Sequence, residues 1–94
     1  MAEWNENSQV LKYQLQAMDR VALRLPARAE VLHVGSQGDN IFLWARIDPF
    51  ATTFEERVFR IAGTGHVDVR GEHVGTVMLM NGALVFHIFE ITNL

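Results

Sequence analysis

Apolar and polar residues alternate along most of this chain with the two-residue period of β-strands. The alternation starts at Leu11, Tyr13 and Leu15 and returns over residues 20–25, 30–34, 41–47 and 57–62. A helix would place apolar residues at i, i+3, i+4 and i+7, and no segment longer than a turn does so. We therefore predict an all-β domain of about seven short antiparallel strands in a sandwich or a small flattened barrel.

The last third of the chain, residues 74–91, consists of two apolar runs joined by Asn81 and Gly82. An Asn-Gly pair between β-favouring runs predicts a hairpin with a type I′ turn, because both residues tolerate positive φ. The final run is apolar on both faces, with Leu84, Phe86 and Ile88 on one side and Val85 and Phe89 on the other. Such a strand is buried either inside the sandwich or against a second subunit, and we expect a homo-oligomer.

The residues between these runs are expected to form the turns and loops that connect the strands. Ala17–Asp19 would form a corner through which the first and second strands pair, and Gly35–Asn40 would be a hairpin loop. Thr52 or Thr53 precedes Glu55 and Glu56 at capping distance, which predicts one helical turn within residues 50–54. Residues 67–73 would be a short strand or a loop. Residues 1–9 resemble a flexible leader in which Trp4 is the residue able to dock on the body, and residues 10–94 form a single β domain.

The composition of the chain argues against several classes of function. The formal net charge is -3 with both signs interspersed, so there is no broad basic face for duplex nucleic acid. Cysteine is absent, which excludes disulfides and thiolate metal sites. The chain begins without the pattern of a signal peptide, and no apolar run is long enough to span a bilayer. We expect a cytoplasmic protein that does not bind membranes.

A glycine-rich turn directly after a predicted strand is the main candidate site. Glycines let backbone N–H groups converge on phosphate or carboxylate oxygens, and Arg46 and Arg60 would add positive charge. Trp44 and Arg46, two residues apart on a strand, would share a face and contact the same ligand. The predicted ligand-binding residues are Trp44, Arg46, Arg60, Gly63, Thr64, Gly65 and His66. The alternative is a tight turn in which the glycines only permit positive φ.

The other chemistry-bearing residues suggest structural roles. Alternate aromatics such as Phe42, Phe59 and Phe89 are typical of a sandwich core, with a stacking surface for a base as the alternative. His66 and Asp68, with His87 and Glu90, do not match a metal-ligand motif, so we predict neither a metal site nor a cofactor. We also predict no catalytic residues, since Ser8 and Ser36 lie in the leader and a loop.

Five segments are distinctive in combination. They are EVLHV at 30–34, LWARIDP at 43–49, RIAGTGH at 60–66, VGTV at 74–77 and LVFHIFE at 84–90. In this order and spacing they resemble a family of small proteins of unassigned role that tailed phages and prophages encode. The resemblance implies a binding protein active in the host cytoplasm and assigns no catalytic residue.

Three functions stay open at this point. The first is a non-enzymatic counter-defence protein that sequesters a small anionic, nucleotide-like ligand. The second is an interaction module that masks a host or virion protein through an apolar β face. The third is a metal-dependent hydrolase with a histidine and carboxylate centre.

Overall fold

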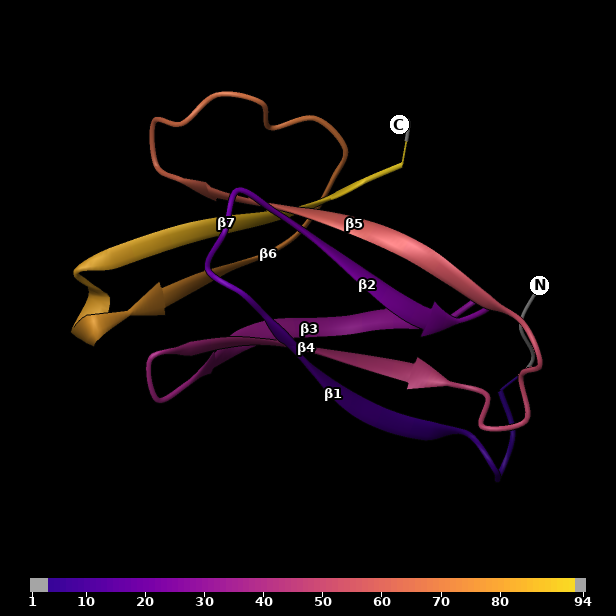
Figure 1. The fold of residues 1–94 in the computed structure, drawn as a ribbon. Helices are drawn as coiled ribbons and strands as arrows, with labels where there is room; N and C mark the ends of the chain where they lie inside the picture. Colours follow the sequence, from indigo (N-terminus) through magenta and orange to yellow (C-terminus); the bar gives the residue numbers. More distant parts are fainter. Residues whose placement is uncertain (1–3, 93–94) are drawn as a thin grey trace.

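The computed structural model describes residues 4–92 and forms a sandwich of two antiparallel sheets (Figure 1). One sheet has the order β1-β4-β3 and the other has the order β2-β5-β7-β6. The strands are β1 (Gln9–Leu15), β2 (Arg20–Pro26), β3 (Glu30–Gln37), β4 (Asn40–Ile47), β5 (Phe54–Gly63), β6 (Glu72–Leu79) and β7 (Leu84–Ile91). The predicted all-β sandwich with seven antiparallel strands is confirmed, and the sheets do not close into a barrel.

The core lies between the two sheets and comes from the alternating residues of each strand. Phe59, Leu43 and Ile88 are fully buried there. In β4 the buried residues Ile41, Leu43, Ala45 and Ile47 alternate with the half-buried Phe42, Trp44 and Arg46. Phe59 is therefore a core aromatic as predicted. Phe42 is not, because it belongs to the alternate set of β4 residues on the outer face of the three-stranded sheet.

The predicted pairing of the first two strands is wrong. β1 pairs with β4, and β2 pairs with β5, so the connection through Ala17–Asp19 passes from one sheet to the other. The Ile61 N–H donates to the Asp19 carbonyl at 3.0 Å, which fixes this connection against the sheet that contains β5. The physical reason is that Leu15 of β1 and Val21 and Leu25 of β2 are buried in the core, and two facing layers bury them as well as a hairpin would.

The final hairpin is confirmed, but its turn is longer than predicted. Leu79 pairs with Leu84, and Met80–Ala83 form the connection, with a short 3₁₀ turn over Met80–Gly82. Met80, Asn81 and Gly82 all have positive φ, so the loop is not a two-residue type I′ turn. The hairpin is nevertheless centred on Asn81 and Gly82, and its register continues to the irregularity between His73 and Gly75.

The other connections differ from the predictions in detail. The β3–β4 hairpin is tighter than predicted, because Gln37 pairs with Asn40 and only Gly38 and Asp39 connect them. The helical turn predicted within residues 50–54 is absent, and β5 already begins at Phe54. Residues 64–71 form a loop. Of the predicted leader, residues 1–3 lie outside the described residues, and Asn5–Ser8 form a turn in which the Ser8 N–H donates to the Asn5 carbonyl at 3.0 Å.

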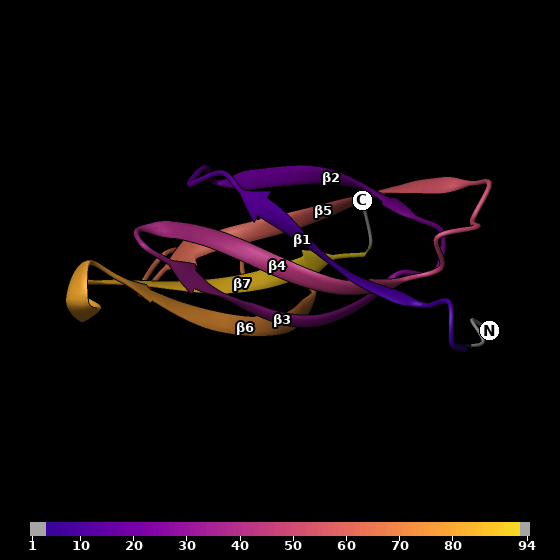
Figure 2. The ribbon, with the colours of Figure 1, turned by 90° about the horizontal axis from the view of Figure 1, so that it is seen from below.

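The two sheets approach closely along the edge where β3 and β6 meet (Figure 2). A Cβ atom at Gly75 of β6 would lie 2.3 Å from Val34 Cγ2 of β3. A glycine is therefore required at this position for the backbone of β6 to pack on β3.

The outer face of the four-stranded sheet is partly covered by the 64–71 loop. Arg60 points outward from β5, yet its side chain is only 8% exposed. All three guanidinium nitrogens donate to backbone carbonyls, at Asp68, Val67, Asp19 and Ile61. On the same face Phe89 is half-buried, and its ring centroid lies 5.2 Å from that of His73. The protein's own chain thus covers part of the second apolar face of β7, and homo-oligomerisation stays a prediction.

Asp68 also fixes the 64–71 loop, through hydrogen bonds from two arginines. These bonds make the stability of the protein depend on pH. Its carboxylate accepts hydrogen bonds from Arg70 Nε at 2.6 Å and from Arg20, and these bonds lower the pKa of Asp68 from 3.8 to about 2. A depressed pKa contributes stability above the unfolded-state value of 3.8 and loses it as the pH falls towards 2. We expect urea unfolding to show Asp68→Asn less stable than the parent at about pH 6 and equal to it at about pH 2. A difference that persists at the lower pH would contradict this account.

Candidate ligand-binding site

An aromatic row lies on the outer face of the three-stranded sheet, along β4. The ring centroid of Trp44 is 5.6 Å from that of His33 and 6.1 Å from that of Phe42. Arg46 follows on the same face, and the ring centroid of Trp4 lies 4.6 Å from its guanidinium carbon. The predictions that Trp44 and Arg46 share a face and that Trp4 docks on the body are both confirmed. Planar stacking of an arginine on an indole is a favourable contact.

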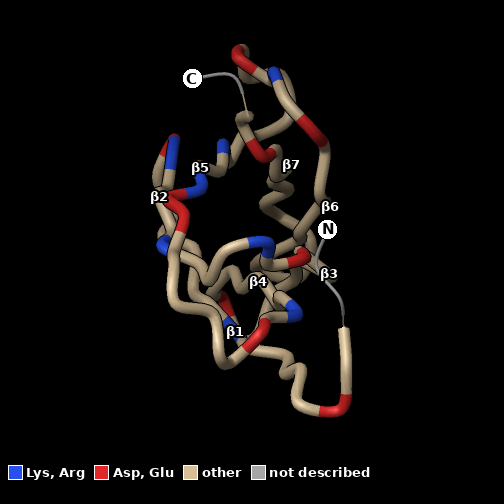
Figure 3. Tube along the Cα trace, turned by 90° about the vertical axis from the view of Figure 1, so that its right-hand side faces the viewer, with Lys and Arg blue, Asp and Glu red and all other residues tan. Residues whose placement is uncertain are grey.

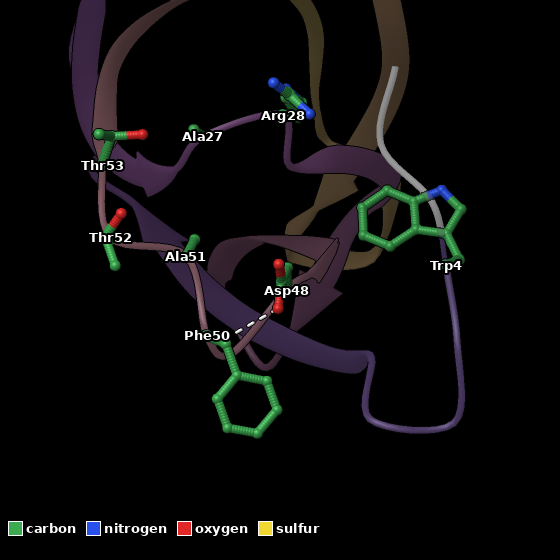
Figure 4. Close-up of a pocket in the computed structure, with 8 residues that line it drawn as sticks. All are labelled: Trp4, Ala27, Arg28, Asp48, Phe50, Ala51, Thr52 and Thr53. Atoms are coloured by element: carbon green, nitrogen blue, oxygen red, sulfur yellow. Dashed lines mark hydrogen bonds between the residues drawn. The ribbon is translucent and has the colours of Figure 1, made fainter.

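A pocket of about 290 Å³ opens beside Trp4 (Figure 4). It lies where the N-terminal segment meets the β2–β3 and β4–β5 connections. We call it the Trp4 pocket, and its lining residues are Trp4, Ala27, Arg28, Asp48, Phe50, Ala51, Thr52 and Thr53. The volume is near the lower end of the range for small-molecule sites, which begins at about 300 Å³.

Hydrogen bonds within the two connections shape this pocket. The Asp48 carboxylate accepts the Phe50 N–H at 2.9 Å, and the Asp48 carbonyl accepts the Ala51 N–H at 3.1 Å. The Ala27 N–H donates to the Thr53 carbonyl at 3.0 Å, which joins the β2–β3 connection to the β4–β5 connection. Asp48 therefore starts a turn that ends at Ala51. This turn takes the place of the helical turn that Thr52 or Thr53 was predicted to cap.

The chemistry of the Trp4 pocket is mixed. In Figure 4 the indole of Trp4 forms one wall, the Thr53 hydroxyl points into the space from the opposite side, and the ring of Phe50 points away. Arg28 supplies a cation and Asp48 a carboxylate. Along the rest of the trace, positive and negative residues are likewise interspersed (Figure 3). A flat ligand with one anionic group and one hydrogen-bond donor fits this set of side chains.

The predicted site residues do not come together. Trp44 and Arg46 lie on the three-stranded sheet, whereas Arg60 and the turn at residues 63–66 belong to the four-stranded sheet. Arg60 lies beneath the 64–71 loop, where its guanidinium bonds to backbone carbonyls. Its position gives it a structural role as an anchor of this loop.

The glycine-rich turn also satisfies its own backbone. The Gly63 N–H donates to His66 Nδ1 at 3.1 Å, and the His66 N–H donates to the Gly63 carbonyl at 3.0 Å. The amides of Gly63 and His66 are thus already paired within the turn. A pocket of about 490 Å³ lies beside this turn, and its other wall is Ala83 with the first three residues of β7, Leu84, Val85 and Phe86. Among the described residues, its lining contains no arginine or lysine.

Sequence reasoning missed two groups of residues. Arg28 and Asp48 reach the Trp4 pocket from separate connections, the first between β2 and β3 and the second between β4 and β5. The second group is a hydrogen-bonded row of Thr64, His87, Thr76 and His73. The signal for it was available, because a hairpin centred on Asn81 and Gly82 places Thr76 directly opposite His87.

The described residues contain no group of three or more histidine, aspartate or glutamate side chains placed to hold a metal ion. Within residues 4–92, the structure also has no helix of the length and apolar character needed to cross a membrane.

A family profile described as "Domain of unknown function (DUF7352)" matches residues 6–93. The chain belongs to this family. The match spans all seven strands and every lining residue of the Trp4 pocket except Trp4 itself, which lies just before it. No curated protein and no solved structure matches the chain.

Proposed function

We propose that this DUF7352 protein binds a small anionic ligand of the nucleotide type in the Trp4 pocket. The observation that supports it is the convergence of an indole wall, a cation and a carboxylate on one space of about 290 Å³. From the resemblance described above, we further propose that the protein is phage-encoded and sequesters a signalling nucleotide in the host cytoplasm, without catalysing its turnover.

Each lining group has a defined task in this proposal. The base stacks on Trp4, a contact worth about 1–3 kcal/mol per base. Arg28 forms charge-assisted hydrogen bonds with a phosphate, and Asp48 accepts a bond from an amino group of the base. The Thr53 hydroxyl, which points into the pocket, bonds to the sugar.

Arg46 and Trp44 support this pocket from the adjoining sheet face. The guanidinium of Arg46 is paired with Glu30 and stacked on Trp4, so it holds the indole in position. Its Nε atom is buried and has no hydrogen-bond partner within residues 4–92. A buried N–H of this kind is costly unless a partner reaches it. Trp44 extends the aromatic surface beyond Arg46 for a ligand with a second ring.

A thermal-shift screen against cyclic nucleotides and adenosine-diphosphate-ribose derivatives tests the proposal. A nucleotide at a hundred times its dissociation constant should stabilise the fold by about 2.7 kcal/mol. Arg28→Asn should remove most of this shift, because a hydrogen bond to a charged group contributes about 1.5–3 kcal/mol. Asparagine is chosen because residue 28 has a φ of 65°, which asparagine tolerates.

Arg24→Asn is the matched control. Arg24 is exposed on β2, where its guanidinium lies over Phe54, and it does not line the Trp4 pocket. The control variant should keep the full thermal shift. A screen in which no nucleotide raises the melting temperature, or in which both variants lose the shift equally, would count against the nucleotide site.

The second candidate is an interaction module that masks a protein. The observation in its favour is the apolar tip of the β6–β7 hairpin, where Met78 is 61% exposed, Met80 57% and Leu84 41%. An ordered hairpin that presents several apolar side chains to solvent is typical of an interaction surface. A flat nucleotide screen would favour this function, and the loss of activity should then follow substitutions at the exposed residues Met78, Met80 and Leu84.

A further inference from the structure

Four polar side chains form a continuous hydrogen-bonded row on the outer face of the four-stranded sheet. Thr64 Oγ1 lies 2.8 Å from His87 Nε2, and His87 Nδ1 lies 3.1 Å from Thr76 Oγ1. Thr76 Oγ1 in turn lies 3.1 Å from His73 Nε2. The row thus runs from the 64–71 loop across β7 to β6, and both ring nitrogens of His87 are engaged by hydroxyl groups.

Counting protons gives the row a direction. A neutral imidazole has one donor and one acceptor nitrogen, and a hydroxyl has one proton to donate. If Thr64 donates to His87 Nε2, then His87 Nδ1–H donates to Thr76, and Thr76 donates to His73 Nε2. This direction uses the proton of every hydroxyl in the row. In this direction His87 Nε2 accepts the Thr64 proton. The bond from His87 Nδ1–H to Thr76 holds the ring in the tautomer that keeps Nε2 free to accept.

A hydroxyl whose proton is accepted by an oriented histidine is the arrangement of an activated nucleophile. Thr64 lines the pocket of about 490 Å³ beside the glycine-rich turn, and its hydrogen bond with His87 is exposed. His66 lines the same pocket. Because His66 Nδ1 accepts the Gly63 N–H, the proton of the neutral ring lies on Nε2, which makes it a donor towards a developing oxyanion.

The composition of this pocket indicates the class of substrate. Its remaining wall consists of Ala83, Leu84, Val85 and Phe86, and none of its lining residues is an arginine or a lysine. A phosphoryl group would have no cation to bind there. An uncharged acyl group would instead be buried against apolar side chains, which is favourable.

We infer from this geometry a second, catalytic site, at which Thr64 and His87 transfer an acyl group from a neutral ester to water. Thr64 Oγ1 forms a bond to the carbonyl carbon while its proton passes to His87 Nε2. The C–O bond to the alcohol breaks, and His87 returns the proton to that oxygen. Water, deprotonated by His87, then attacks the acyl-threonine, so that the carboxylic acid leaves and the Thr64 hydroxyl is restored. This site is independent of the proposed nucleotide pocket.

The experiment uses p-nitrophenyl acetate as the probe and has two readouts. The first is the rate of p-nitrophenolate release. The second is mass spectrometry of the tryptic peptide 61–70, which contains Thr64 and ends at Arg70. We expect acetylation of Thr64 and a release rate that falls roughly a hundredfold or more in Thr64→Val and His87→Gln, the scale of general-base catalysis. Thr64→Ser keeps the hydroxyl and should keep the activity.

Surface histidines also react with this ester, and the Thr64→Val variant separates that reaction from the proposed one. A histidine acting alone would release p-nitrophenolate equally fast in Thr64→Val and in the parent. That result, or acetyl groups found only outside peptide 61–70, would overturn the inference. Thermal unfolding of each variant verifies that the fold is intact, and if the valine variant does not fold, the presence or absence of an acetyl group on Thr64 of the parent protein decides the test.

Discussion

Replacing Arg60 with methionine should lower the free energy of unfolding by about 4 kcal/mol, measured by urea denaturation. The guanidinium donates to the carbonyls of Asp68 at 3.1 Å, Val67 at 2.8 Å, Asp19 at 3.2 Å and Ile61 at 3.0 Å. Hydrogen bonds from charged groups contribute about 1.5–3 kcal/mol each, and several are lost together here. Methionine keeps the apolar stem, so the loss reports on the hydrogen bonds and not on packing.

The same variant should release the 64–71 loop. Amide hydrogen exchange within residues 64–71 should accelerate strongly, while exchange in the core strands should follow only the global change in stability. Arg24→Met, an exposed arginine on the neighbouring strand, should change stability by no more than about 0.5 kcal/mol. If Arg60→Met changes the free energy of unfolding as little as this control does, Arg60 does not anchor the loop. That result would favour the predicted role of Arg60 in ligand binding.

Replacing Glu90 with glutamine should lower the free energy of unfolding by about 3 kcal/mol, since it removes the carboxylate that forms the bidentate pair with Arg57 between the sheets. Arg57 Nε and Nη2 bond to the two Glu90 carboxylate oxygens at 2.6 and 2.8 Å, and Arg57 Nη1 donates to the Ala29 carbonyl. These side chains are only 18% and 11% exposed. The hydrogen bond to Glu90 raises the pKa of Arg57 above its usual value, as expected for a stabilised cation.

A double-mutant cycle measures this ion pair. The double variant Arg57→Met, Glu90→Leu should be more stable than either single variant, because apolar residues of similar volume replace both charges. Stability changes that simply add would show that the two side chains act independently, in conflict with the bidentate geometry.

The strands were predictable from the sequence because the alternation of apolar and polar residues is a local pattern. The pairing of the strands was not predictable, because it depends on contacts between segments distant in sequence. Leu11, Tyr13 and Leu15 identify a strand, but nothing in their spacing states that β1 pairs with β4 and not with β2. In β4 both faces carry large apolar residues, so the pattern did not reveal that Phe42 and Trp44 face outward. The hairpin centred on Asn81 and Gly82 was predictable, since a short turn sets its own register.

The site residues were harder to predict for the same reason. Arg60 was predicted to bind a ligand because an arginine near a glycine-rich turn suggests an anion site. Its burial depends on a loop that folds back over β5, which no local pattern describes. The Trp4 pocket is assembled from three segments distant in sequence, so Trp4, Arg28 and Asp48 carried no common signal.

Chemical-shift mapping of the ¹⁵N-labelled protein during titration with adenosine-diphosphate-ribose and cyclic nucleotides is the most direct test of the proposed function. We predict that a binding nucleotide shifts the signals of the Trp4 indole N–H and of the backbone amides of Arg28 and residues 50–53. The amides of residues 63–66 should not move. Shifts confined to residues 63–66, or spectra unchanged by every nucleotide at millimolar concentration, would contradict a nucleotide site in the Trp4 pocket.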